Sequence, residues 1–452
     1  MADTLSHKLT LKRIRIDRLF QIDVGKLRSR FIIRKSDVAF ALLYLGVLIA
    51  YLGSLNPWFM WKLNHIYPII ASMPVVVAWL LSRTLKEQLF TRTDYKYPAI
   101  AFIVISLYMA IVNDLGMNGY IIIVFKLIVF MVFFSLKIDF LRRLMKWMCV
   151  TMALMMMVSI PYYFLYLLGF SLPNSSVENE DLMYSFYNYY LFLLDNRIAA
   201  DAILPRFHSV FLEPGHLGSA CVFLLMTQIS HWRKWYNVIL FITVALTFSL
   251  AAYLLMTVLY FISVWLRRKN LWARILIISA VLTVGCVFAY NYNRGDNLVN
   301  IFILERLEIN DEGKFEGDNR VTEEFDDEFD DFMSSSDVLF GRKFEISKYG
   351  WGNSGYRVFI YDYGLMFVLL LILFYLICIH HATNVRAKLV VFAFGAVTFW
   401  ARSNLLDFFD FFPLYAMAYI TPIFTKFVGN EKSGSVDHNS CLQSQTSGCG
   451  DD

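Results

Sequence analysis

Long apolar runs separated by short charged connectors extend over most of the chain. A helix that crosses a bilayer needs roughly 20 predominantly apolar residues, and the connectors divide the chain into twelve runs of up to about this length. The predicted helices cover residues 38–54, 66–82, 97–113, 119–136, 147–169, 210–229, 236–248, 251–266, 271–289, 356–379, 389–400 and 409–425. The pattern predicts an all-α, polytopic integral membrane protein with about 12 transmembrane helices and a large external loop between helices 9 and 10.

Two of these runs, 236–248 and 251–266, could instead form one long helix. Residues 233–234 before the pair and 267–269 after it are basic. Because basic connectors stay on the cytoplasmic side, a tight hairpin that turns near Ser249 is favoured.

Composition and charge agree with this topology. Hydrophobic residues make up 58% of the chain and charged residues only 17%, which excludes a soluble domain of ordinary composition. The segments assigned to the cytoplasm hold 28 of the 41 lysines and arginines. The positive-inside bias therefore places both termini in the cytoplasm.

The chain divides into five segments. They are a basic cytoplasmic arm at 1–37, helices 1–9 at 38–289 with an external loop at 171–209, an acidic external loop at 290–354, helices 10–12 at 355–426, and a disordered cytoplasmic tail at 427–452. The acidic loop holds 16 Asp and Glu against 7 Lys and Arg. In its EEFDDEFDD stretch, Phe325 and Phe329 fall on one side of a helix. Either a solvated acidic helix or a divalent-cation site explains these carboxylates, although the spacing is not that of an EF-hand, and no metal site is assigned.

Polar and ionisable side chains crowd the start of the sixth predicted helix. This stretch, ILPRFHSVFLEPGHLGSA, contains Arg206, His208, Glu213 and His216. Glu213 followed by proline is typical of a helix start, whose backbone amides could hold an anion together with Arg206. We expect His208, Glu213 and His216 to be catalytic proton carriers. Alternatively, Glu213 only caps the helix and Arg206 binds lipid headgroups.

Cations gather at a second predicted helix start, after the acidic loop. Arg342 and Arg357 lie there, and Arg402 is in the last external turn. Arginine matches phosphate oxygens bidentately, so these three and Arg206 are predicted to bind a diphosphate. Pairing of Arg402 with Asp407 is an equally good interpretation.

Lys126 falls in the middle of a predicted transmembrane helix. A charge at that depth costs at least a few kcal/mol, so internal packing against Asp114 or another acid is favoured over catalysis.

Three motifs resemble those of one family. RFHSVFLEPGHLGSA at 206–220 resembles a signature in which Arg-Phe precedes a Glu-Pro-Gly turn entering a helix, and LTFSLAAYL at 246–254 resembles a Thr-x-Ser-x-x-Ala hairpin. SGYRVFIYDYGLMF at 354–367 resembles the helix after a large external loop. In this order, over about residues 200–380, they resemble the Wzy-type O-antigen and capsular polysaccharide polymerases of the O-antigen ligase/polymerase superfamily.

The resemblance implies a glycosyltransferase in the bacterial inner (cytoplasmic) membrane, with no cofactor. It would join oligosaccharide repeat units carried on undecaprenyl diphosphate at the periplasmic face. The implied partners are these lipid-linked glycans, membrane lipid, and chain-length regulator and flippase proteins, with no nucleic acid. Two positions depart from the pattern: Leu250 replaces an arginine common in relatives, and Asn353 stands where ligases carry a catalytic histidine.

A lipid-linked oligosaccharide flippase or another polytopic transporter is the alternative function. Carriers often show repeated halves and polar groups near the bilayer midplane. The chain shows no convincing internal repeat, and its ionisable groups collect at the outer boundary. These features favour chemistry at the membrane surface.

Overall fold

The computed structural model describes the greater part of the chain between residues 35 and 420. The described residues are 35–63, 66–84, 89–90, 96–179, 184–196, 205–229, 231–267, 271–295, 297, 300–305, 308, 321–349, 353–382, 385–401, 403 and 406–420. The predicted basic arm up to residue 34 and the predicted tail at 427–452 lie outside them.

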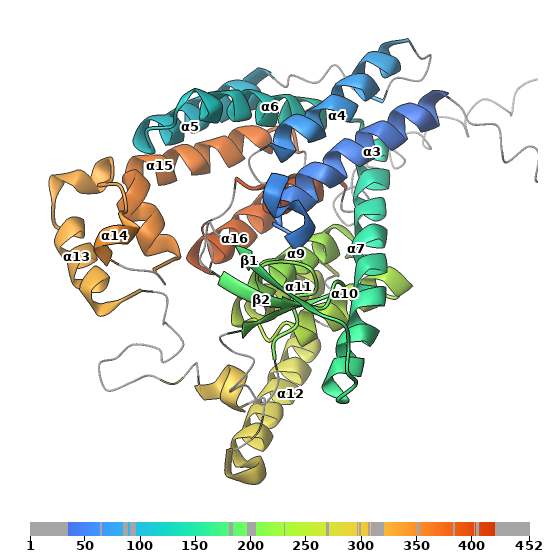
Figure 1. Cartoon of the computed structure of the whole chain (residues 1–452), viewed down its shortest axis with the longest axis vertical. Coiled ribbons are helices and arrows are strands. Elements are labelled where there is room, and N and C mark those ends of the chain that lie inside the picture. Colours follow the sequence, from blue (N-terminus) through green and yellow to red (C-terminus); the bar gives the residue numbers. More distant parts are fainter. Residues whose placement is uncertain are drawn as a thin grey trace, which may run out of the picture.

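The structure is mostly helical, and each of the twelve predicted apolar runs contains a helix (Figure 1). These helices are α3 (Lys35–Ser54), α4 (Tyr67–Arg83), α5 (Lys96–Val112), α6 (Met117–Phe134), α7 (Ile138–Leu167), α9 (Pro214–Thr227), α10 (Trp235–Leu246), α11 (Leu250–Arg267), α12 (Leu271–Asn291), α15 (Tyr356–Cys378), α16 (Val385–Ala401) and α17 (Phe408–Ile420). Within the described parts of the chain, α3, α6, α7 and α15 are long and apolar enough to cross a membrane by length and composition. Shorter apolar helices and the single turns η1 (Trp58–Leu63), η2 (Tyr292–Gly295) and η3 (Asn300–Leu304) accompany them.

The predicted hairpin is confirmed. Helix α10 ends at Leu246 and α11 begins at Leu250, and the turn between them places Phe248 at φ 44°. The Tyr253 hydroxyl donates to the Ala245 carbonyl at 2.6 Å, which ties the two helices together across the turn.

Helix α9 forms the centre of the bundle. Every side chain from Leu217 to Thr227 is buried, and α7, α10, α11 and α17 pack around the helix. A Cβ atom on Gly218 would lie 2.6 Å from the Ala252 Cβ and 3.0 Å from the Thr247 Oγ1. The glycine therefore lets α9 approach the α10–α11 hairpin closely, just after the helix begins.

A small β-sheet lies within residues 171–209, where the sequence analysis placed an external loop, so the all-α prediction missed this part. Strands β1 (Ser175–Asn179), β2 (Tyr184–Asn188) and β3 (Leu193–Asp195) form an antiparallel sheet in the order β1-β2-β3. Successive side chains of a strand point to opposite faces of a sheet. In β2, accordingly, Phe186 and Asn188 are buried while Tyr187 between them is exposed.

Helix α7 begins nine residues earlier than predicted, at Ile138 instead of residue 147. Its first turns carry Arg142 and Arg143, which lower the local hydropathy and hid this helix start in the sequence. The two cations pair with carboxylates: Arg142 with Asp139 at 3.0 Å, and Arg143 with Asp37 of α3 at 3.5 Å.

The second half of the segment that was predicted to be a large external loop forms a unit around an aromatic core. The acidic unit, as we call the described residues between 321 and 363, contains α13 (Glu323–Met333), η5 (Ser336–Leu339), α14 (Ile346–Tyr349) and the first turns of α15. Its core consists of Phe325, Phe329, Phe332, Tyr349 and Tyr361. The predicted placement of Phe325 and Phe329 on one side of a helix is confirmed, with the carboxylates on the other side.

Helix α15 is broken at Gly364, where the backbone adopts φ 75° and ψ 170°. Gly341, at φ 87°, lies against this break: a Cβ on Gly341 would meet the Asp362 carbonyl oxygen at 2.4 Å. The Arg342 amide donates to the Tyr361 carbonyl at 2.7 Å. The first turns of α15 therefore belong to the acidic unit, and only the residues after Gly364 continue as an apolar helix.

Candidate functional site

A pocket of about 170 Å³ lies between the β-sheet and the start of α9. It is lined by Tyr184, Phe186, Leu194, Asp195, Pro205, Arg206, His208, Leu212, Glu213 and Pro214. The structure thus brings together Arg206, His208 and Glu213, three of the predicted site residues. It adds Asp195, which the sequence analysis did not single out.

The backbone that carries these side chains is held by neighbours from several elements. The Phe207 amide donates a hydrogen bond to the Leu246 carbonyl of the hairpin at 3.2 Å, and the Trp58 amide donates one to the Val210 carbonyl at 3.0 Å. The Leu193 amide of β3 donates to Ser209 at 2.8 Å. Helix, hairpin and sheet therefore position one short irregular segment.

Arg206 lies where the pocket meets the hairpin. Its Nε donates to the Thr247 carbonyl oxygen at 3.2 Å. Thr247 belongs to the motif that resembles the polymerase hairpin, so the structure brings two of the three motifs into contact. This hydrogen bond orients the guanidinium at the pocket wall.

His208 is almost completely buried, with 3% of its surface exposed. Its Nδ1 lies 2.6 Å from the Phe211 carbonyl oxygen, and because a carbonyl only accepts, Nδ1 carries the hydrogen and Nε2 is the basic nitrogen. Burial lowers the pKa of His208, against the opposing effects of this hydrogen bond and of Asp195. The ring is therefore neutral at neutral pH.

Glu213 is the N-cap residue of α9, and Pro214 follows in the first turn, as predicted. The backbone of Glu213 is extended, with φ −132° and ψ 139°, and its side chain makes no capping hydrogen bond. The carboxylate lines the pocket instead. Helix capping alone therefore does not account for a glutamate at this position.

His216 lies outside the pocket. Its ring is 5.7 Å from that of Phe409 in α17, so it lies at the interface between α9 and the last helix. His208 in the irregular segment before α9 and His216 in the first turn of α9 therefore lie at different sites, although the sequence placed them in a single cluster.

The cations of the second cluster pair with carboxylates of the acidic unit. Arg342 bonds Glu328 at 3.0 Å and Asp337 at 2.8 Å, and Arg357 bonds Asp326. Burial raises the pKa of Glu328, but the hydrogen bond from Tyr361 and the charges of Lys348 and Arg342 outweigh it and leave this pKa below its usual value. The Glu328 carboxylate is thus held in its charged form.

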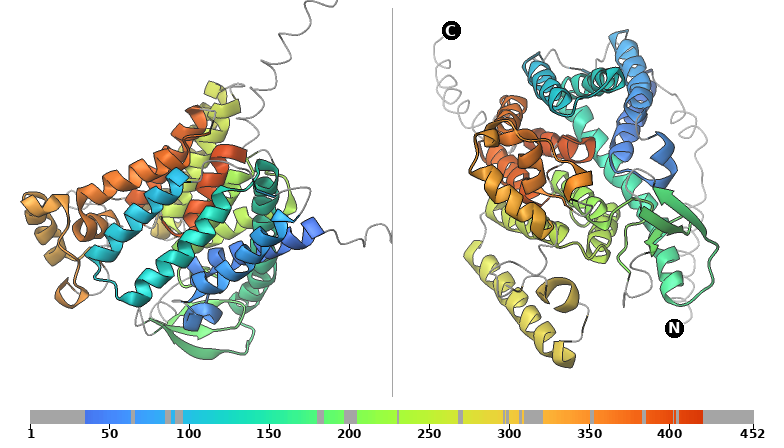
Figure 2. Two further views of the ribbon diagram at one scale, coloured as in Figure 1. Left: turned by 90° about the horizontal axis from the view of Figure 1, so that it is seen from above. Right: turned by 60° about the vertical axis from the view of Figure 1, so that its left-hand side comes forward.

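The two clusters belong to different regions of the molecule. The acidic unit and the β-sheet lie apart in Figure 1 and in both views of Figure 2. Neither Arg342 nor Arg357 lines the pocket that contains Arg206. Arg402 lies outside the described residues.

Asn353 has a structural role in the acidic unit. Its Oδ1 accepts from the Thr322 amide at 2.7 Å, and its Nδ2 donates to the Tyr349 carbonyl at 2.9 Å. Asn353 therefore joins the start of α13 to α14.

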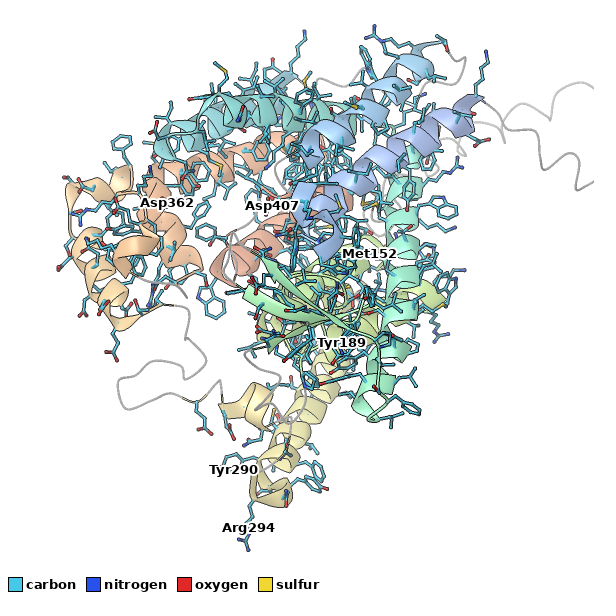
Figure 3. All side chains as sticks on the ribbon, viewed as in Figure 1. Met152, Tyr189, Tyr290, Arg294, Asp362 and Asp407 are labelled. Carbon is cyan, nitrogen blue, oxygen red and sulfur yellow. The ribbon has the colours of Figure 1, made fainter. Side chains whose placement is uncertain are left out.

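Lys126 of α6 has an internal acidic neighbour, as expected. Asp407, which precedes α17, lies in the interior of the bundle (Figure 3). Burial raises the pKa of Asp407, and the Lys126 charge opposes this shift. An interior position near Asp407 accounts for Lys126 without a catalytic role.

Sequence reasoning missed Asp195 because it is one acid at the end of a long aromatic loop. The available signal was the aromatic stretch YSFYNYYLF at 184–192, to which the sequence analysis assigned no strand. Tyr184 and Phe186 of β2 do line the pocket. In the part of the chain that the structure describes, no group of three His, Cys, Asp or Glu residues could hold a metal ion.

The pocket therefore combines one arginine, two carboxylates, a neutral histidine and two aromatic rings at the start of a buried helix. Such a set can bind an anion, accept a proton and stack against a sugar ring. Comparison with protein-family models, curated proteins and solved structures finds no match for this chain.

Proposed function

We propose that this chain is a polysaccharide polymerase that joins oligosaccharide repeat units carried on undecaprenyl diphosphate, at the periplasmic face of the bacterial inner membrane. The pocket before α9 is the observation that carries the proposal. It combines groups for a diphosphate, a hydroxyl and a sugar ring, next to the hairpin whose sequence resembles that of the polymerases. The apolar helices support a membrane location.

The reaction transfers the growing glycan from its lipid diphosphate to a hydroxyl of the next unit. The acceptor oxygen forms a bond to the anomeric carbon, and the bond from that carbon to the diphosphate oxygen breaks with its electron pair. The acceptor proton passes to a base, which typically contributes 10²–10⁴-fold to the rate. Cations that stabilise the departing diphosphate contribute more.

The proposal gives each pocket residue a role. Arg206 contacts the departing diphosphate, because a guanidinium is always charged and binds phosphate oxygens with two parallel hydrogen bonds. Glu213 accepts the acceptor proton. Asp195 binds other hydroxyls of the acceptor sugar, and Tyr184 and Phe186 stack against its ring.

The ion pairs of the acidic unit change the roles expected for the other arginines. Because Arg342 and Arg357 pair with carboxylates of the acidic unit, we assign them to the architecture of that unit. Because Arg206 lines the pocket, we assign it to the diphosphate. His216 packs against Phe409 and has no role in the proposed chemistry.

The test is glycan chain length in a deletion strain complemented with single variants. Arg206→Ala and Glu213→Gln are expected to reduce polymerisation at least about 100-fold, so that single repeat units replace long chains. Arg294→Ala is the matched control for Arg206, because Arg294 points away from the molecule beyond α12 (Figure 3). Glu178→Gln, at an exposed position of β1, is the control for Glu213.

Three outcomes decide the proposal. Normal chain length in Arg206→Ala at normal membrane levels contradicts the assignment of the diphosphate to this pocket. Lipid-linked single units that collect on the outer face of the deletion strain support a polymerase. Units trapped on the inner face identify a flippase and overturn the proposed reaction.

A further inference from the structure

An apolar groove of about 640 Å³ runs between α5 and α15, on the side of the bundle away from the candidate site. The two helices lie side by side in Figure 1. The groove is lined by the first turns of α5, from Tyr97 to Ile105, and by the last turns of α15, from Leu370 to Ile377, with His380 and His381 after the helix end.

The antiparallel pair is closed by aromatic contacts at one end, and at the groove a ring pair, Phe102 and Phe374 at 6.1 Å, bridges the two helices. At the closed end the Tyr108 hydroxyl donates to the Tyr363 carbonyl at 2.8 Å, and the Tyr108 ring lies 5.4 Å from that of Phe367. At the opposite end the facing residues of α5 include the small Pro98 and Ala101. These side chains are too short to fill the space between the two helices.

One end of the groove is basic. His380 and His381 form its rim, with their rings 5.1 Å apart, and both are exposed. Lys388 of α16 donates to the His380 carbonyl at 2.9 Å, which holds its ammonium group at the same end. The sequence from 379 to 401 contains Arg386 beside these three residues and no Asp or Glu.

We propose that this groove binds an anionic phospholipid, with an acyl chain along α5 and α15 and the phosphate at the basic rim formed by His380, His381 and Lys388. A surface that is apolar along its length and basic at one end is complementary to an amphiphile with one anionic end. The rim coincides with the ends of both helices, which is the depth at which a headgroup meets water. Tyr97 lies at this level, as aromatic residues at membrane interfaces do.

The charge distribution favours a phospholipid over a second copy of this chain. A helix from another copy would need a long apolar face and gains nothing from cations at one end only. A phosphate diester gains from each cation near it, about 1 kcal/mol per basic residue close to the membrane surface. Binding is therefore expected to depend on headgroup charge, which distinguishes a lipid site from a simple apolar gap.

The experiment measures the lipid retained by the full-length protein. The protein is purified in detergent, incubated with phosphatidylglycerol or phosphatidylcholine of identical acyl chains, and examined by native mass spectrometry. We expect the wild type to retain phosphatidylglycerol preferentially. Lys388→Gln with His380→Gln and His381→Gln is expected to reduce that preference about fivefold or more, the effect of losing at least one nearby cation.

A second variant tests the groove itself. Ala101→Trp fills the space between the helices and is expected to reduce retention of both lipids. Ile121→Trp, at an exposed position of α6, is the matched control and is expected to leave retention unchanged. If Ala101→Trp fails to fold, the rim variant alone decides, because its side chains are exposed or half-buried.

Several results would overturn the proposal. Equal retention of the two lipids by the wild type would show that the rim does not select charge. An unchanged preference in the rim variant would place the phosphate elsewhere. A dimer mass that Ala101→Trp abolishes would identify a second copy as the occupant, and co-purified polyprenyl phosphate in place of phospholipid would identify a different lipid.

Discussion

The pocket before α9 and the acidic unit contain the same kinds of charged residue but use them differently. In the acidic unit, arginines and carboxylates pair directly around an aromatic core. In the pocket, Arg206 and His208 bond to backbone carbonyls, and two carboxylates line an open space. Charges that pair around an aromatic core stabilise a fold, whereas charged side chains that line a cavity can contact a ligand that enters it. The location of a cation therefore says less about its function than the groups around it.

The largest effect is expected from the aromatic core of the acidic unit. Phe325 is fully buried against four other aromatic rings, so Phe325→Ala is expected to destabilise the unit by about 3–5 kcal/mol. Limited proteolysis within residues 321–349 measures this. Phe340→Ala, at a position that is 60% exposed, is the control. Equal resistance to protease in both variants would refute the role of the core.

The one-sided spacing of Phe325 and Phe329 made this core predictable from the sequence. Its partners were not predictable, because Tyr361 lies 32 residues after Phe329 and only folding brings the two rings together. The break at Gly364 was also hidden, since the hydropathy of residues 356–379 is continuous across it. Asp195 reached the pocket through a strand pairing that five-residue segments barely indicate.

Arg357 tests whether paired charges stabilise the acidic unit. Arg357 and Asp326 are 22% and 14% exposed, so Arg357→Ala is expected to destabilise the unit by about 1.5–3 kcal/mol. In the pocket, Arg206→Ala removes one bond to a backbone carbonyl and is expected to cost about 1 kcal/mol while abolishing activity. Thermal unfolding and chain length are measured for both variants.

A double-mutant cycle with Asp326→Asn isolates the ion pair from the other contacts of Arg357. Arg142→Ala is the control, because Arg142 and its partner Asp139 are 44% and 91% exposed and such an exposed pair contributes less than about 1 kcal/mol. If Arg357→Ala abolishes polymerisation and leaves stability unchanged, Arg357 belongs with Arg206 in substrate binding.

Gly218 tests how the hairpin supports the pocket. A methyl group at this position meets Ala252 and Thr247, so Gly218→Ala is expected to push α9 and the hairpin apart at a cost of about 1–3 kcal/mol. Because Arg206 bonds the Thr247 carbonyl, polymer length is expected to fall as well. Gly285→Ala, where a Cβ atom meets open space, is the control. Full activity in Gly218→Ala would show that this contact does not position Arg206.

The smallest expected effect is a difference between the pocket and the acidic unit in the pH at which each loses stability. His208 has a lowered pKa, so below its ordinary value of about 6.5 the unfolded chain takes up a proton that the folded pocket does not, and stability falls. Glu328 also has a lowered pKa, but its stabilising effect is complete above the ordinary value of about 4.3 and is lost only as the pH falls below it. The pocket is therefore expected to loosen at a higher pH than the acidic unit.

Hydrogen-exchange protection of single amides measures separately the pH range over which the pocket loses stability and the range over which the acidic unit does. The Leu193 amide, which is hydrogen-bonded to the Ser209 carbonyl, reports on the pocket. The Arg342 amide, which is hydrogen-bonded to the Tyr361 carbonyl, reports on the acidic unit. Between about pH 6.5 and 5, protection at Leu193 is expected to fall while protection at Arg342 stays constant. His208→Gln removes the titrating ring, so its Leu193 protection is expected to be independent of pH over this range. If the dependence persists in His208→Gln, the histidine does not control the stability of the pocket, and the assignment of this pH dependence to His208 is wrong.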